Sequence, residues 1–188
     1  MKKIAALLVL FVLSACSWRS PNSSFYVMKS ADLQPISEKK INVLVERVKV
    51  PDMLDRAQMV INDKDSSKIQ VLEFERWGEV YSDIIQSTVT DDLIAYLPNA
   101  YVKRTYSDGD ATMYAVNIEV NKIQAYKEDK VILSVWWNIR DTKGKIVGRK
   151  QGRYEAKVHG DDIQDLVNAQ AETVHQMSRD IADALISK

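Results

Sequence analysis

The second half of the chain contains three consecutive segments in which apolar and polar residues alternate, and this pattern constrains the fold more than any other feature. The segments are 114–125, 131–139 and 146–158. Because successive side chains of a β-strand point to opposite faces, such alternation predicts three strands with one buried face. Short polar turns separate them, and Gly144 can adopt the positive φ that a tight hairpin turn requires. The pattern therefore predicts an antiparallel meander.

Three details of this meander give sharper expectations. The apolar parity slips by one residue near Asn121-Lys122, which predicts a β-bulge there. Trp137 falls in the alternating apolar positions of the middle strand, so its side chain is expected on the buried face, whereas Trp136 points to the opposite face. Lys150 interrupts the apolar face of the last strand. Either that strand bends at Lys150 or the lysine side chain reaches past an edge of the sheet.

Two other segments have apolar residues at spacings of three and four, the period of an amphipathic helix. The first runs from about 75 to 97 and is ended by Pro98. The second opens at Asp161, and Gln164 follows at the spacing of a capping box, with aspartate in place of serine or threonine. Its expected buried stripe consists of Ile163, Val167, Ala171, Val174, Ile181 and Leu185.

Shorter strand candidates occupy the first half of the chain, at 25–28, 41–50, 58–62 and 69–74, where β-branched and aromatic residues gather. The order along the chain is thus strands, a helix, three strands and a helix. This order predicts an α/β fold, a two-layer sandwich in which one mostly antiparallel sheet carries two helices packed on one face.

The N-terminus has the features of a lipoprotein signal peptide. Lys2-Lys3 precedes an apolar run, 4–12, that is too short to span a bilayer. The run ends in the lipobox Leu-Ser-Ala-Cys, in which small residues precede the cysteine whose thiolate accepts the lipid. We expect residues 1–15 to be cleaved and Cys16 to be lipidated. The alternative is an ordinary secretory signal followed by a chance cysteine.

The rest of the chain divides into a tether and one domain. Residues 16–24 form the lipidated tether. Its part after the cysteine, 17–24, is mostly small and polar and spans less than about 30 Å even when extended. Residues 25–188 are long enough for a single domain. Cys16 is the only cysteine, so we expect no disulfide and no cysteine-based metal site. Ser17 stands where lipoproteins retained in the inner membrane carry aspartate. It predicts an outer-membrane anchor, with the domain facing the periplasm.

The sequence contains none of the familiar catalytic, nucleotide-binding or metal-binding motifs. His159 and His175 do not belong to any catalytic or metal-binding motif, and we interpret each as a surface or boundary residue. The adjacent pairs Asp91-Asp92 and Asp161-Asp162 point apart on a helix, so we assign them to capping and solvation. We therefore expect no enzyme activity, metal or cofactor. The formal net charge of +0, without a block of like charge, gives nucleic-acid binding no support.

Two clusters remain as candidates for a binding surface. In the first, Pro51 breaks a strand and displays Asp52, Asp55 and Arg56 at a turn, where binding residues are often found. The second contains Arg76-Trp77, and these residue types are enriched in interface hot spots. The structural alternative is a loop ion pair in the first cluster and a core tryptophan in the second.

Taken together, the two clusters resemble a known family. The run from Pro51 to Val60, followed by Glu-Arg-Trp-Gly-Glu at 75–79, is similar to the PqiC-type auxiliary lipoproteins of ABC-type transport systems. The lipobox, an early strand and the final helix also match in position, so the resemblance covers nearly the whole chain. Met53 replaces an aromatic residue of the family pattern, Ala57 a proline and Gly78 an alanine, which indicates a divergent member.

The resemblance implies a non-enzymatic role. Such lipoproteins work with MCE-domain proteins, which are anchored in the inner membrane and form tubes for lipid transport and envelope integrity. This chain would dock the outer-membrane end of such a tube, as a homo-oligomer. The alternative is a structural lipoprotein of another envelope assembly or secretion machine, and a periplasmic hydrolase is a third, less favoured hypothesis. The candidate partner-binding residues are Asp52, Asp55, Arg56, Arg76 and Trp77.

Overall fold

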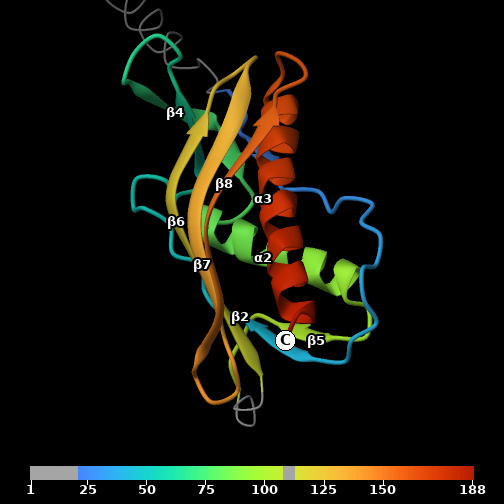
Figure 1. Ribbon diagram of the computed structural model, residues 1–188. Coiled ribbons are helices and arrows are strands. Elements are labelled where there is room, and N and C mark those ends of the chain that lie inside the picture. Colours follow the sequence, from blue (N-terminus) through green and yellow to red (C-terminus); the bar gives the residue numbers. More distant parts are fainter. Residues whose placement is uncertain (1–20, 108–112) are drawn as a thin grey trace, which may run out of the picture.

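The strands are divided between two sheets, and two helices pack on one face (Figure 1). The computed structural model describes residues 21–107 and 113–188, so the expected signal peptide, 1–15, and Cys16 lie outside the described residues. The elements are β1 (Ser24–Tyr26), β2 (Asn42–Val45), β3 (Gln58–Asn62), β4 (Ile69–Trp77), α2 (Tyr81–Tyr96), β5 (Tyr101–Lys103), β6 (Tyr114–Ala125), β7 (Lys130–Arg140), β8 (Ile146–Lys157) and α3 (Ile163–Ile186).

The larger sheet has the strand order β5-β2-β6-β7-β8, and its centre is the predicted meander. β6, β7 and β8 pair antiparallel, which confirms that prediction. The register shifts between Val120 and Lys122, where the bulge was expected. Gly144 has a φ of 77° in the β7–β8 turn, a conformation that glycine adopts without steric cost.

The strands of the first half differ from the sequence pattern in their extent and pairing. β2 is regular only over Asn42–Val45, and its pairing with β6 resumes in a single bridge between Lys49 and Glu119. After Pro51 the chain leaves the large sheet. β3 then pairs with β4, and β4 with β1, to form a second sheet of order β1-β4-β3. The mixed α/β architecture is confirmed, with the first-half strands shared between both sheets.

α2 begins at Tyr81, six residues later than the periodicity indicates. Residues 75–77 instead continue β4, because Arg76 pairs with both Gln58 and Phe25 and the Trp77 amide donates to the Ala57 carbonyl at 2.6 Å. The helix ends at Tyr96, shortly before Pro98, as expected.

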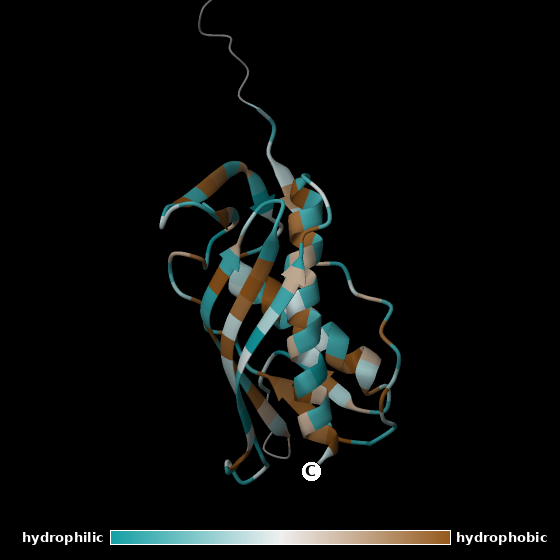
Figure 2. Ribbon diagram, turned by 45° about the horizontal axis from the view of Figure 1, so that its top comes forward, coloured by the Kyte–Doolittle hydropathy of each residue, from teal (hydrophilic) through white to brown (hydrophobic). Residues whose placement is uncertain are grey.

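α3 buries the predicted stripe, with Ile163 only half-buried at its start. The expected capping box is wrong, because the helix starts one residue later and its N-cap, Asp162, makes no side-chain capping bond. Lys150 reaches past the edge of β8 to Asp180 on α3, which decides between the two alternatives for that lysine. Hydrophobic and hydrophilic residues alternate along the long strands (Figure 2).

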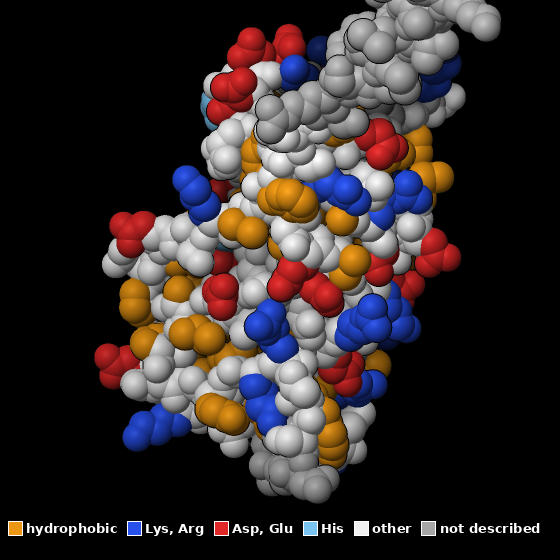
Figure 3. All heavy atoms as spheres, turned by 180° about the vertical axis from the view of Figure 1, so that it is seen from behind, with side chains coloured by type: hydrophobic (Ala, Val, Ile, Leu, Met, Phe, Trp, Pro, Cys, Tyr) orange, Lys and Arg blue, Asp and Glu red, His pale blue; other side chains and the backbone are white. Residues whose placement is uncertain are grey.

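The core lies between the large sheet and the two helices. α3 runs along β7 and β8, and α2 crosses it (Figure 1). Trp137 points into this core and is 5% exposed, whereas Trp136 on the opposite face is 55% exposed, as their parity predicts. On the face of the molecule shown in Figure 3, acidic and basic side chains are intermixed. No helix in the described part of the chain is long and apolar enough to cross a membrane.

Candidate partner-binding surface

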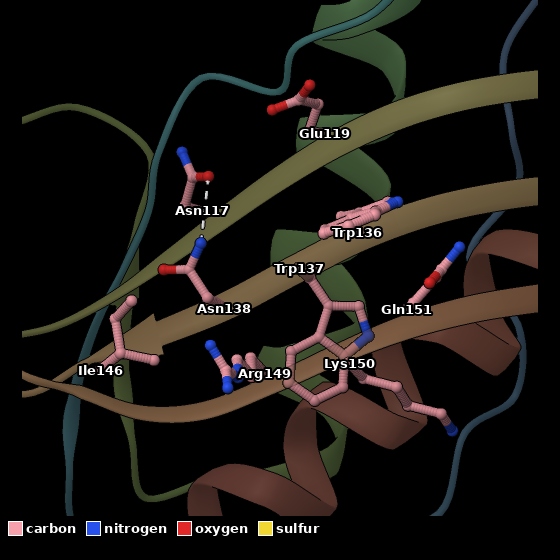
Figure 4. Close-up of a pocket in the computed structure, with 9 residues that line it drawn as sticks. All are labelled: Asn117, Glu119, Trp136, Trp137, Asn138, Ile146, Arg149, Lys150 and Gln151. Atoms are coloured by element: carbon pink, nitrogen blue, oxygen red, sulfur yellow. Dashed lines mark hydrogen bonds between the residues drawn. The ribbon is translucent and has the colours of Figure 1, made fainter.

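The face of the large sheet opposite the helices carries a groove of about 470 Å³ (Figure 4). Trp136 lies at its centre, with Glu119 of β6 and Gln151 of β8 as its cross-strand neighbours. The next outward-facing row consists of Asn117, Asn138 and Arg149. Aromatic and arginine side chains are enriched among the residues that dominate interface energetics, so this groove is a candidate binding surface.

The polar groups of this groove differ in how firmly they are held, and Asn117 donates to the Glu46 carboxylate at 3.2 Å. The Asn138 side-chain amide donates to the Asn117 side-chain carbonyl at 3.4 Å, the long end of hydrogen-bond range. Within the described residues, Arg149 forms no ion pair. An exposed guanidinium without a partner carboxylate costs little desolvation to bring into a new contact. The groove therefore offers both an aromatic anchor and an available cation.

The first sequence cluster forms a tight turn whose acidic residues have different roles. The amides of Leu54 and Asp55 donate to the Pro51 carbonyl at 2.7 and 3.1 Å. Asp55 accepts a hydrogen bond at 3.0 Å from the backbone amide of Ser82, in the first turn of α2. It thereby caps a helix whose own N-cap residue provides no side-chain bond. Asp52 is exposed to solvent.

The second cluster packs directly against the first. Trp77 is 3% exposed, and its ring centroid lies 5.2 Å from that of Tyr81. The expectation that Trp77 is at least partly buried is confirmed. The Nε atoms of Arg56 and Arg76 are enclosed without a hydrogen-bond partner, as is Oε2 of Glu75.

Glu75 also affects a neighbouring tyrosine at the start of the domain. A hydrogen bond to Glu75 is the largest cause of the raised pKa of the Tyr26 phenol, and burial and the Glu75 charge act in the same direction. Tyr26 pairs with Trp77 across β1 and β4. The second cluster is thus part of the pairing of β1 with β4 within the small sheet.

The two sequence clusters and the groove lie on connected parts of the molecule. Lys49, two residues before Pro51, bridges to Glu119, which lines the groove. The segment that leads into the Pro51 turn therefore runs along one border of the groove. Asp55 and Trp77 themselves contact Ser82 and Tyr81 of α2, so the two clusters lie towards the helix-covered side of the sheet, whereas Trp136 lies on the open face.

Arg56→Ala is expected to leave the melting temperature within about 3 °C of wild type, because the enclosed Nε makes no hydrogen bond that the substitution would break. Co-purification with the partner protein should fall. Thermal denaturation and quantitative pull-down on the same preparations check both parts. A large drop in melting temperature, with binding reduced only in proportion to the folded fraction, would assign Arg56 a structural role.

The buried pair of His175 and Asp92 was not predicted from the sequence. His175 of α3 is 6% exposed and Asp92 of α2 is 1% exposed, and the His175 Nδ1 atom lies 2.9 and 2.8 Å from the two carboxylate oxygens. The interpretations of His175 as a surface or boundary residue and of Asp92 as solvated are therefore wrong. A signal was present, because each residue interrupts the apolar stripe of its own helix, one with an acid and one with a base.

The pair has the arrangement of a structural ion pair. Burial lowers the pKa of His175, but the hydrogen bond and charge of Asp92, the charge of Glu172 and the backbone carbonyl of Lys29 together outweigh it and raise the pKa. No nucleophilic side chain among the described residues is hydrogen-bonded to His175. The described residues also contain no cluster of three or more metal-ligating side chains.

Comparison with known proteins gives one family and a set of similar folds. A family model described as the ABC-type transport auxiliary lipoprotein component matches residues 26–182. A crystal structure of an uncharacterized protein is 21% identical, with a TM-score of 0.73, over 88% of this chain and 99% of that one. Protein XCC0632 from Xanthomonas campestris is 11% identical, with a TM-score of 0.67, over 85% and 92%. No curated protein matches the chain.

Proposed function

Because the chain belongs to the ABC-type transport auxiliary lipoprotein components, we propose that it is the outer-membrane lipoprotein that docks a periplasm-spanning MCE-protein tube. Its role is to support lipid transport between the membranes and envelope integrity. The observation that carries this proposal is the family match, which extends over nearly the whole domain. The family is an auxiliary transport component and not an enzyme family.

The open sheet face supports docking as the molecular task. It presents an exposed tryptophan in a groove, bordered by the segment that leads to the Pro51 turn. A tube with rotational symmetry offers an equivalent surface at each repeat, so the docking subunit is expected to be present in several copies. We therefore propose a homo-oligomer assembled on the tube.

Anchoring can be tested through the residue after the lipidated cysteine. Ser17→Asp should move the protein from the outer-membrane to the inner-membrane fraction, because aspartate at this position retains lipoproteins of this type. Membrane fractionation followed by immunoblotting measures the shift. Cys16→Ala is the matched control and should take up no labelled palmitate, since the chain has no second cysteine. Wild type found mainly in the inner membrane would contradict the proposed location.

Docking can be tested at Trp136. Trp136→Ala should reduce co-purification with the MCE-domain protein by at least about tenfold, the loss expected for an aromatic hot-spot residue. Ile94→Ala, which removes an apolar side chain of similar exposure (48%) from α2, is the control and should bind like wild type. If wild type captures no MCE-domain protein but reproducibly captures a component of a secretion or assembly apparatus, the alternative function is correct.

A further inference from the structure

Among the described residues, no strand pairs with the outer edge of β8 in the large sheet, and the backbone groups that point outward can be assigned from the register. The amide of Val158 donates to the Asp129 carbonyl at 2.9 Å. This bond fixes the even-numbered residues of β8 as those that hydrogen-bond to β7. The odd-numbered residues consequently direct their N–H and C=O groups away from the sheet. The Gln176 side chain of α3 donates to the Glu155 carbonyl from that outer side, in agreement with the assignment.

The exposed edge is centred on three odd-numbered residues, Arg149, Gln151 and Arg153. A row of free N–H and C=O groups on an edge strand is a template for an additional strand. α3 flanks this edge and covers only part of it, through Gln176 and through the ion pair of Lys150 with Asp180. A strand placed there would lie beside the Trp136 groove, because Gln151 is the cross-strand neighbour of Trp136.

The charge of the β8 edge indicates which side chains a strand added to it would carry. β8 contains the basic residues Arg149, Lys150, Arg153 and Lys157 and a single acidic residue, Glu155, in a chain whose formal net charge is +0. Arg149 and Arg153 lie on the open face on either side of Gln151. Among the described residues only Arg153 of the two has an acidic partner, Glu155 at 3.2 Å, and Glu155 also pairs with Lys130. A strand with carboxylates on alternate residues would place them next to these guanidinium groups, as cross-strand pairing of opposite charges requires.

A second copy of this chain does not supply such a strand from its described residues. The other edge strands are β1, β3 and β5. The longest of them, β3, has five residues, and none of the three contains aspartate or glutamate. β8 has twelve residues, so these edges match it neither in length nor in charge. Pairing of β8 with β8 of a second copy, antiparallel about Gln151, would match in length but would place Arg149 opposite Arg153, and like charges directly opposite each other are destabilising. These comparisons favour a segment of another protein as the added strand.

We propose that β8 binds an extended acidic segment of the partner protein, which adds to the large sheet as a sixth strand. The identity of that partner rests on the proposed function, but the chemistry of the site does not. Main-chain hydrogen bonds to the odd-numbered residues supply affinity, and Arg149 and Arg153 select acidic side chains.

Two synthetic peptides test the edge without the MCE-domain protein: a ten-residue alternating Thr-Glu peptide and a Thr-Lys peptide of the same length. Wild type should bind the Thr-Glu peptide and not the Thr-Lys peptide in isothermal titration calorimetry. Gln151→Pro removes one outward N–H without touching the bonds to β7, and should weaken binding of the Thr-Glu peptide at least about tenfold. Gln151→Ala keeps the backbone donor and should bind like wild type.

Several results would overturn the proposal. These are equal binding of the Thr-Glu peptide by Gln151→Pro and wild type, no binding of either peptide, or concentration-dependent self-association of wild type that Gln151→Pro abolishes. Circular dichroism establishes that the proline variant is folded. If it is not, the double substitution Arg149→Glu/Arg153→Glu decides, and should reverse the preference to the Thr-Lys peptide. Failure of the tube protein to co-purify concerns the proposed function and leaves the peptide result unaffected.

Discussion

Replacing His175 with alanine is expected to destabilise the fold by about 3–5 kcal/mol, because it leaves the buried carboxylate of Asp92 without its partner. Asp92 is 1% exposed and both of its oxygens contact the imidazole. Chemical denaturation measures the loss. His159→Ala is the matched control, since His159 is exposed, and should change stability by less than about 0.5 kcal/mol.

A double substitution separates the loss of the pair from the cost of the unpaired charge. His175→Leu/Asp92→Leu should be more stable than His175→Ala, because it removes the buried carboxylate as well. If His175→Ala were as stable as wild type, Asp92 would have to be solvated, and the packing of α2 against α3 described above would be wrong.

The same pair predicts the pH dependence of stability. The pKa of His175 is raised above its ordinary value of 6.5 in the folded state. Its stabilising contribution is therefore fully present below pH 6.5 and is lost as the pH rises through the higher folded pKa. Denaturation curves of wild type should show falling stability over that range, and the His175→Leu/Asp92→Leu variant should lack this component.

Trp137→Ala is expected to cost about 3–5 kcal/mol, the loss typical of truncating a large aromatic side chain in a core. The indole is 5% exposed, and its N–H donates to the Tyr154 hydroxyl at 3.3 Å. That hydroxyl in turn donates to Asp180 at 2.7 Å. The substitution thus also breaks the start of a chain of hydrogen bonds that joins β7, β8 and α3. Chemical denaturation gives the difference.

Trp136→Ala provides the control within the same strand. Its side chain lies on the open face, so the substitution should cost less than about 1 kcal/mol. Equal and large losses at both positions would mean that the outer face of the large sheet is covered as tightly as the inner one, which would also remove the proposed docking groove.

Local patterns predict the parts of the fold that depend on near neighbours. A period of two along single strands is enough to predict the meander, its bulge near Lys122 and the opposite orientations of Trp136 and Trp137. The start of α2 could not be predicted in this way, because residues 75–77 have helical spacing but are held in β4 by contacts with β1 and β3. Partners distant in sequence override a local period in that segment.

For the candidate site too, the unusual residues could be recognised from the sequence but their contacts could not. The sequence identifies Asp55, Arg56, Arg76 and Trp77 as unusual, and the structure places these residues together. It does not reveal that Asp55 binds the amide of Ser82 or that His175 meets Asp92, because those contacts join residues 27 and 83 positions apart. The groove around Trp136 depends on three strands and can be recognised only once their register is known.

The capping of α2 by Asp55 has a consequence for local opening. The N-cap residue of the helix makes no side-chain bond, so the bond from the Ser82 amide to Asp55 ties its first turn to the Pro51 turn. The turn and the start of the helix therefore open together as one cooperative unit. Solvent exchange of the Ser82 amide proton measures that opening directly, and a partner that immobilises the Pro51 turn will slow this exchange without touching the helix.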